Sequence, residues 1–106
     1  MTPEEINEGL LKEFALYRET EVVSPELKRL LINLILQVSY DRYKSMNENL
    51  RILCESEAYI HCCKNSVYFN PDKTNKARAY VMTIIRCSFA STVVKESHFK
   101  QTKIEI

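Results

Sequence analysis

Residues that form tight turns are nearly missing from this chain, which has one glycine, Gly9, and three prolines in 106 residues. The short connections between β-strands depend heavily on glycine and proline at defined turn positions. A sheet built from hairpins would therefore have too few of the residues that it needs. The sequence predicts a mainly helical protein.

Capping signals and apolar spacing place two helices in the first half of the chain. Thr2 is expected to cap the first helix and to form a capping box with Glu5, and this helix runs to about residue 17. The second starts after Ser24, ends near residue 43 and has a wide stripe of leucine, isoleucine and valine at three-to-four spacing. Its width predicts that the second helix is the central one.

The second half is expected to contain two more helices, over about residues 50–66 and 76–95, separated by a polar loop at 69–75. Proline disfavours helix at Asn70, and Thr74 or Asn75 is expected to cap the helix that follows. We therefore expect an all-α fold, with one compact four-helix domain over residues 1–96. A basic, flexible tail is expected over residues 97–106.

Charge is unevenly distributed, although the net charge is only +1. Residues 1–57 contain seven Lys/Arg and eleven Asp/Glu, a net −4, whereas residues 58–106 contain eight and three, a net +5. A basic segment of this kind is a weak indication of a surface that binds polyanions such as nucleic acids. No apolar run approaches the roughly 20 residues that span a bilayer, and the N-terminus is acidic, so we expect a cytosolic protein that binds no membrane.

The cysteines include an adjacent pair and lack the CxxC spacing of zinc fingers. We expect all four, Cys54, Cys62, Cys63 and Cys87, to be reduced and metal-free. A metal site built from Cys54, His61 and Cys62 is the alternative. It is disfavoured because neighbouring residues on a helix point to different sides.

Motifs of catalysis are missing as well. With Gly9 as the only glycine the chain has no glycine-rich phosphate loop, and it has neither a nucleophile elbow nor an HExxH pattern. His98 has no nearby carboxylate at ligand-like helical spacing, and Glu55 and Glu57 lie on different sides of their helix. We therefore expect a binding protein that needs no cofactor rather than an enzyme.

Residues 53–96 carry an ordered set of short motifs. They read Glu57-Ala58-Tyr59-Ile60, Lys64, Phe69-Asn70-Pro71-Asp72-Lys73, then Ala79-Tyr80-Val81-Met82-Thr83-Ile84-Ile85-Arg86 and Phe89. This order resembles the second conserved region of the sigma-70 family, most closely the short late-gene sigma factors of T-even-like bacteriophages. The chain departs from the bacterial pattern at Thr83-Ile84, where the bacterial factors have paired tryptophans.

The resemblance implies a sigma factor reduced to its promoter-melting domain, acting in the cytoplasm of an infected bacterial host. Such a protein binds a coiled coil of the largest subunit of the RNA polymerase core and holds the non-template strand of a −10-like element of phage late promoters. Carried over to this chain, the polymerase-facing residues are Glu55, Glu57, Tyr59, Ile60, His61, Lys64 and Asn65. The DNA-binding residues are Lys73, Lys76, Arg78, Tyr80, Thr83, Arg86 and Lys95.

Two other functions stay open. One is a polymerase-binding regulator of the same fold that represses transcription, as an anti-sigma-like adaptor would. The other is a nonspecific helical nucleic-acid-binding protein. For Tyr80, both core packing and stacking on a flipped base are compatible with the pattern. The resemblance does not include the sigma-factor domain that reads the upstream promoter element. A separate coactivator that replaces this domain is therefore a further candidate partner.

Overall fold

The computed structural model describes the backbone of residues 2–104 and the side chains of residues 2–97. Over that range it has no strand, four α-helices and one short 3₁₀-helix. None of the helices described is both long enough and apolar enough to cross a membrane. The predicted all-α class and the number of helices are confirmed. Their bounds are α1 Pro3–Thr20, α2 Pro25–Arg42, α3 Glu48–Asn65, η1 Ser66–Tyr68 and α4 Ala77–Ile104.

Side-chain caps set the starts of the first three helices. Thr2 caps α1 and forms the predicted capping box with Glu5. Ser24 caps α2 by accepting a hydrogen bond from the Leu27 N–H at 3.0 Å. Asn47 caps α3 by accepting from two N–H groups of its first turn. Each such cap typically stabilises a helix by about 1 kcal/mol.

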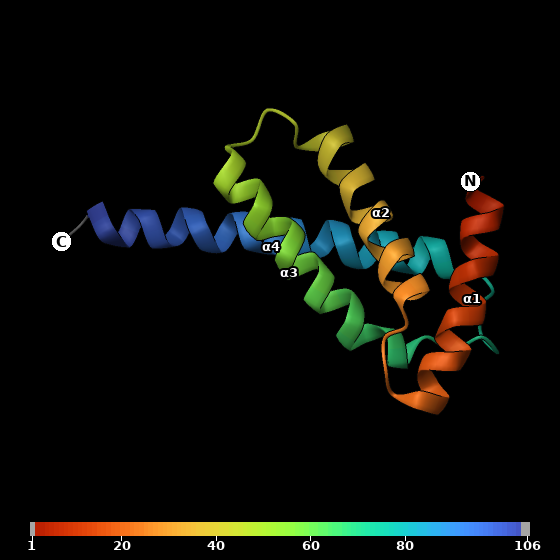
Figure 1. Ribbon diagram of the computed structural model, residues 1–106. Helices are drawn as coiled ribbons and strands as arrows, with labels where there is room; N and C mark the ends of the chain where they lie inside the picture. Colours follow the sequence, from red (N-terminus) through yellow and green to blue (C-terminus); the bar gives the residue numbers. More distant parts are fainter. Residues whose placement is uncertain (1, 105–106) are drawn as a thin grey trace.

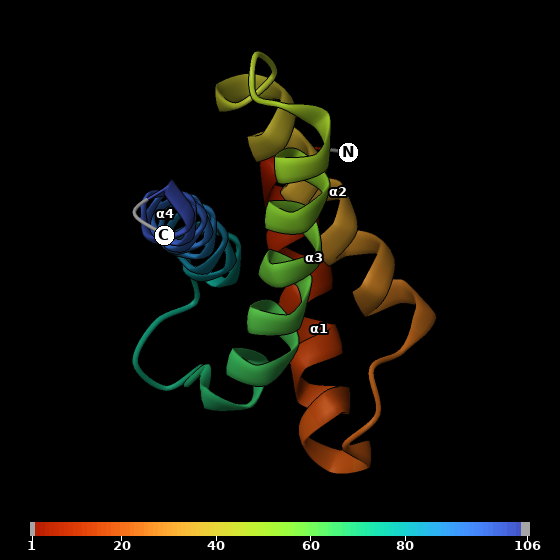
Figure 2. The same ribbon diagram turned by 90° about the vertical axis from the view of Figure 1, so that its left-hand side faces the viewer.

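The helices pack around one core, with α4 running across the other three (Figures 1 and 2). In Figure 2, α4 is seen end-on beside α3, while α1 and α2 stand behind α3. Both α2 and α4 contact every other α-helix, which agrees with the central place predicted for α2. The predicted stripe of α2 is buried, namely Leu27, Leu30, Leu31, Leu34, Ile35 and Val38.

The single glycine lies where α1 crosses α2. A Cβ atom at Gly9 would lie 3.2 Å from Cδ1 of Leu30, closer than ordinary van der Waals contact. Glycine lowers helix stability relative to alanine, by roughly 1 kcal/mol in an exposed helix. Here its missing side chain allows α1 to approach Leu30, which is almost fully buried.

The end of α4 differs from the prediction. We expected the helix to end near Lys95 and residues 97–106 to form a flexible tail, but α4 continues to Ile104. The helix end was predicted near the last residue of the apolar stripe. The residues that follow contain no glycine or proline that would stop a helix, so the helix continues. Residues 105 and 106 lie outside the described part. The last turns of α4 project beyond α3 (Figure 1), whereas Glu96 still lies beside the start of α3.

The start of α4 also differs. Neither Thr74 nor Asn75 takes the predicted capping role, since Thr74 Oγ1 accepts from the N–H of Lys76, before the helix begins. Asn7 of α1 fills that place: its Oδ1 accepts from the Arg78 N–H at 2.9 Å, in the first turn of α4. The cap comes from a residue 71 positions away, and local sequence cannot indicate it.

Candidate functional site

The loop before α4, residues 69–76, is anchored at its start and exposed thereafter. Phe69 is buried, and its ring centroid lies 5.3 Å from that of Phe14 on α1 and 5.2 Å from that of Tyr80 on α4. Residues 70–76 are all exposed. The two lysines predicted to meet DNA in this loop are Lys73 and Lys76. Both are therefore exposed to solvent, on a loop whose first residue is anchored in the core.

The geometry of Tyr80 favours packing over stacking on a base. Its ring meets that of Phe69 edge-on, and its hydroxyl donates a hydrogen bond to the backbone oxygen of Asn65 at 2.8 Å. Burial raises the pKa of the Tyr80 hydroxyl, as expected for a side chain partly removed from water. Because both its ring and its hydroxyl are engaged, Tyr80 links α4 to the end of α3.

The seven predicted polymerase-facing residues are spread around α3 rather than gathered on one side. Their burial and helical spacing divide them into three neighbouring groups. Glu55, Tyr59 and Ile60 line a groove against α2, Glu57 and Lys64 lie on the outer surface, and His61 and Asn65 line a cleft against α4.

The groove between α2 and α3 has a volume of about 410 Å³ and mostly apolar walls. Ile60 and Leu36 are 44% and 36% exposed, high values for large aliphatic side chains. Glu55 is already engaged within the protein, because it accepts a hydrogen bond from the buried hydroxyl of Ser39 at 2.6 Å. Ile60 and Leu36 are therefore accessible to a partner, whereas the Glu55 carboxylate is not free. Its lining residues are Lys28, Ile32, Ile35, Leu36, Glu55, Ser56, Tyr59 and Ile60.

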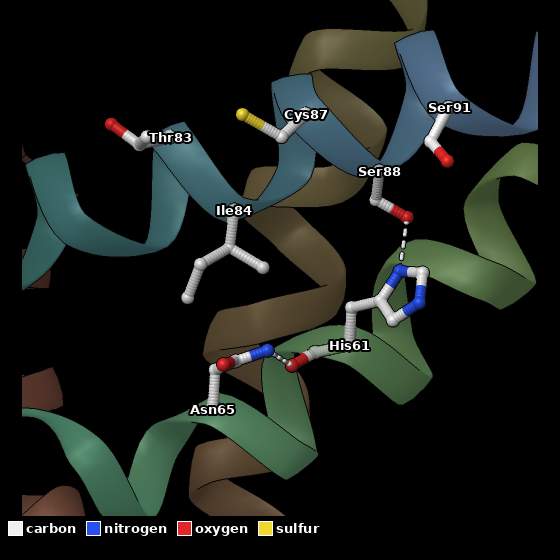
Figure 3. Close-up of a pocket in the computed structure, with 7 residues that line it drawn as sticks. All are labelled: His61, Asn65, Thr83, Ile84, Cys87, Ser88 and Ser91. Atoms are coloured by element: carbon white, nitrogen blue, oxygen red, sulfur yellow. Dashed lines mark hydrogen bonds between the residues drawn. The ribbon is translucent and has the colours of Figure 1, made fainter.

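The cleft between α3 and α4 lies on the other flank of α3 and has a volume of about 300 Å³ (Figure 3). The Nδ1 atom of His61 lies 2.6 Å from Oγ of Ser88, and Asn65 donates to the His61 backbone oxygen at 2.8 Å. Figure 3 shows Ile84 pointing between the two helices. Thr83, predicted to meet DNA, borders the same cleft as His61 and Asn65, predicted to meet polymerase.

The predicted DNA-binding residues of α4 do not share one side. Thr83 and Arg86 are exposed neighbours at i and i+3. Lys95 is also exposed, but nine positions along a helix of 3.6 residues per turn place it about 180° from Arg86. Between residues 79 and 94 the exposed surface of α4 consists of small or neutral residues apart from Arg86. Few phosphates can be contacted on this side of α4.

Arg78 lies on yet another side, facing α1. It lines a cavity together with Glu4 and Glu8, and its Nε atom is buried without a hydrogen-bond partner among the residues described. Lys76 lines the same cavity, and the two carboxylates reduce the attraction of both cations for a phosphate. Arg78 is therefore a weaker candidate for DNA contact than Lys73 or Arg86.

The cysteines are free thiols in different surroundings. Cys54 and Cys62 are buried, Cys63 is half-buried and Cys87 is exposed. The alternative site of Cys54, His61 and Cys62 is not formed, since no group of three or more metal-ligating side chains is found among the described residues. The imidazole of His61 instead contacts Ser88.

Reactivity toward a thiol reagent should follow this order of exposure. In the folded protein, Cys87 is expected to react first and Cys62 last, because burial raises the pKa of Cys62 to about 12 and leaves almost no thiolate near neutral pH. Timed alkylation with peptide mass spectrometry measures the order. Denatured, unreduced protein should give four thiols. Stoichiometric zinc, or fewer thiols, would contradict the prediction.

The comparisons with known proteins are negative. No family model, no curated protein and no solved structure matches the chain. The resemblance to the sigma-70 family therefore stays a prediction from the residues of this chain, to be weighed with the geometry described above.

Three residues of the candidate site were not predicted from the sequence. Ile32 and Leu36 of α2 line the groove with Ile60, and a helical pattern alone does not say which neighbour they meet. Asn7 was missed because it acts at a helix start far along the chain. Its one signal is an asparagine within a helix, where this residue is unfavourable unless its side chain finds a specific partner.

Proposed function

We propose that this protein is a sigma-like transcription initiation factor that binds the core of a bacterial-type RNA polymerase and opens a −10-like element of phage late promoters. The observation that carries the proposal is the division of its accessible residues into two surfaces. An apolar groove lies between α2 and α3, and exposed cations lie on the loop before α4 and on α4 itself. The resemblance assigns polymerase and DNA to these two regions.

The groove has the character of a protein-binding surface. Exposed Ile60 and Leu36 offer aliphatic contact, and Lys28 at the edge of the groove supplies a charge. Protein interfaces commonly combine an apolar centre with a polar rim. A helical surface of the polymerase, such as the coiled coil implied by the resemblance, fits a groove between two helices.

The other surface suits a single strand better than a duplex backbone. Lys73 and Lys76 on the loop and Arg86 on α4 are exposed, but Thr83 and its neighbours on α4 are neutral. Nonspecific binding to duplex DNA needs many phosphate contacts, because each contact adds only a small, salt-dependent amount to the affinity. The scarcity of cations therefore counts against the third candidate, a nonspecific DNA-binding protein.

The same observations favour a second candidate, a polymerase-binding regulator that represses. A protein with an apolar groove and few cations can bind polymerase through α2 and α3 without opening DNA. Both candidates predict binding to the polymerase core, and they differ in what happens to the promoter.

Run-off transcription with purified polymerase core on an AT-rich late promoter separates the candidates. A sigma-like factor gives a discrete transcript that requires both proteins. A regulator gives no transcript and reduces transcription by the polymerase with the host's own sigma factor. DNA binding without polymerase and without sequence preference would support the nonspecific protein and overturn the proposal.

Arg86→Ala is expected to lower promoter opening about fivefold while polymerase binding is unchanged, since a phosphate contact is lost and α3 is untouched. The slope of log affinity against log salt should fall by about one. Lys12→Ala is the matched control, because it removes an exposed cation of α1 that is not among the predicted DNA-binding residues. Permanganate footprinting measures opening. Equal opening by Arg86→Ala and wild type across a salt series would remove Arg86 from the DNA-binding surface.

A further inference from the structure

Asn7 connects α1 to the loop and to the start of α4. Its Nδ2 donates to the backbone oxygen of Asn75 at 2.8 Å, and its Oδ1 accepts from the Arg78 N–H at 2.9 Å. One amide side chain thus bonds on both sides of Lys76, first to the residue before it and then to the second residue after it. The backbone of Lys76 is held between these two points.

Within the described part of the chain, the rest of the loop makes only local hydrogen bonds. Asn70 Oδ1 accepts from the Asp72 N–H at 2.9 Å, and its backbone oxygen accepts from Lys73 and Thr74. These bonds shape the turn but do not fix it to the helices. The burial of Phe69 fixes the first end of the loop, and Asn7 fixes the last.

We infer that Asn7 is a positioning residue of the proposed DNA-binding surface, an inference that rests on the proposed function. Asn7 acts through the backbone on either side of Lys76 and holds Lys73 and Lys76 in place before DNA arrives. A loop ordered in advance loses less conformational entropy on binding, so its contacts contribute more to affinity. Without Asn7, the last end of the loop would have to be ordered by the DNA itself.

Asn7→Ala tests the inference, with Asn47→Ala as the matched control. Both variants replace an asparagine that caps a helix, Asn47 at α3 and Asn7 at α4, so similar decreases in melting temperature are expected. Only Asn7→Ala should loosen the loop. We expect amide hydrogen exchange over residues 72–78 to become about tenfold faster in this variant, and unchanged in Asn47→Ala.

Promoter opening supplies the functional measurement. With polymerase core and an AT-rich promoter, well below the melting temperature, Asn7→Ala should open DNA about fivefold less well than Asn47→Ala, with equal polymerase binding. Equal opening by the two variants would overturn the positioning role alone. Failure of the wild-type protein to open any promoter would overturn the proposed function and this inference with it, whatever the exchange rates.

Asn7→Asp separates the two hydrogen bonds. A carboxylate still accepts from the Arg78 N–H, but it cannot donate to the backbone oxygen of Asn75. We expect a melting temperature near that of the wild type together with faster exchange in the loop. Exchange at the wild-type rate would show that the bond to Asn75 does not anchor the loop and would contradict the inference.

Discussion

Phe69→Ala is expected to lower the free energy of unfolding by about 3–5 kcal/mol, the usual cost of deleting a buried aromatic ring. Phe69 is 2% exposed and its ring lies between those of Phe14 and Tyr80, so one substitution removes contacts to both α1 and α4. Domains of this size are commonly stable by about 5–15 kcal/mol, so much of the total would be lost. Urea unfolding followed by circular dichroism measures the change.

The neighbouring residue provides the control. Tyr68 is 74% exposed, and Tyr68→Ala should change stability by less than about 0.5 kcal/mol. The comparison separates the loss of a core ring from the loss of an aromatic residue in the same short segment. A decrease of less than about 1 kcal/mol in Phe69→Ala would contradict the buried position of Phe69 and with it the fixed first end of the loop.

Ile60→Asp is expected to weaken binding to the polymerase core by more than about tenfold, because a charge placed in an apolar interface must be desolvated. Ile60 is 44% exposed, so the folded monomer should tolerate the change with little loss of stability. Surface plasmon resonance with immobilised core enzyme measures the affinity. The melting temperature should be measured alongside to check the fold.

Val94→Asp is the matched control for Ile60→Asp. Val94 is 67% exposed on α4, outside the α2–α3 groove, and the same substitution there adds the same charge. We expect wild-type polymerase binding from this variant. Wild-type affinity of both variants for the core enzyme would rule out the groove as the polymerase-binding surface. Equal losses would indicate a general effect of charge rather than a local contact.

The helices could be predicted from the sequence because their signals are local. Thr2 and Ser24 cap within their own first turns, and the leucine stripe of α2 repeats at helical spacing. The end of α4 could not be predicted in the same way. An apolar stripe reports which part of a helix is covered by neighbours, whereas the helix itself continues until a stopping residue or an unfavourable run.

The candidate site was harder to predict, because it depends on which helices meet. Spacing along α3 alone does not say that Ile60 lies beside α2 while His61 lies beside α4. The pattern around Tyr80 is compatible with packing and with stacking, and only its contacts to Phe69 and Asn65 distinguish the two. Tertiary neighbours, which a single sequence does not display, decide these roles.

The hydrogen bonds of Asn7 also bear on the order in which the molecule folds. They join α1 to residues 68 and 71 positions further along the chain, whereas consecutive helices, α1 and α2 among them, contact each other directly. Closing a long loop costs entropy that local contacts do not require, so distant pairings tend to form after nearby ones. Docking of α1 against α4 is then a late step in folding, and the loop that carries Lys73 and Lys76 becomes ordered only when that step is complete.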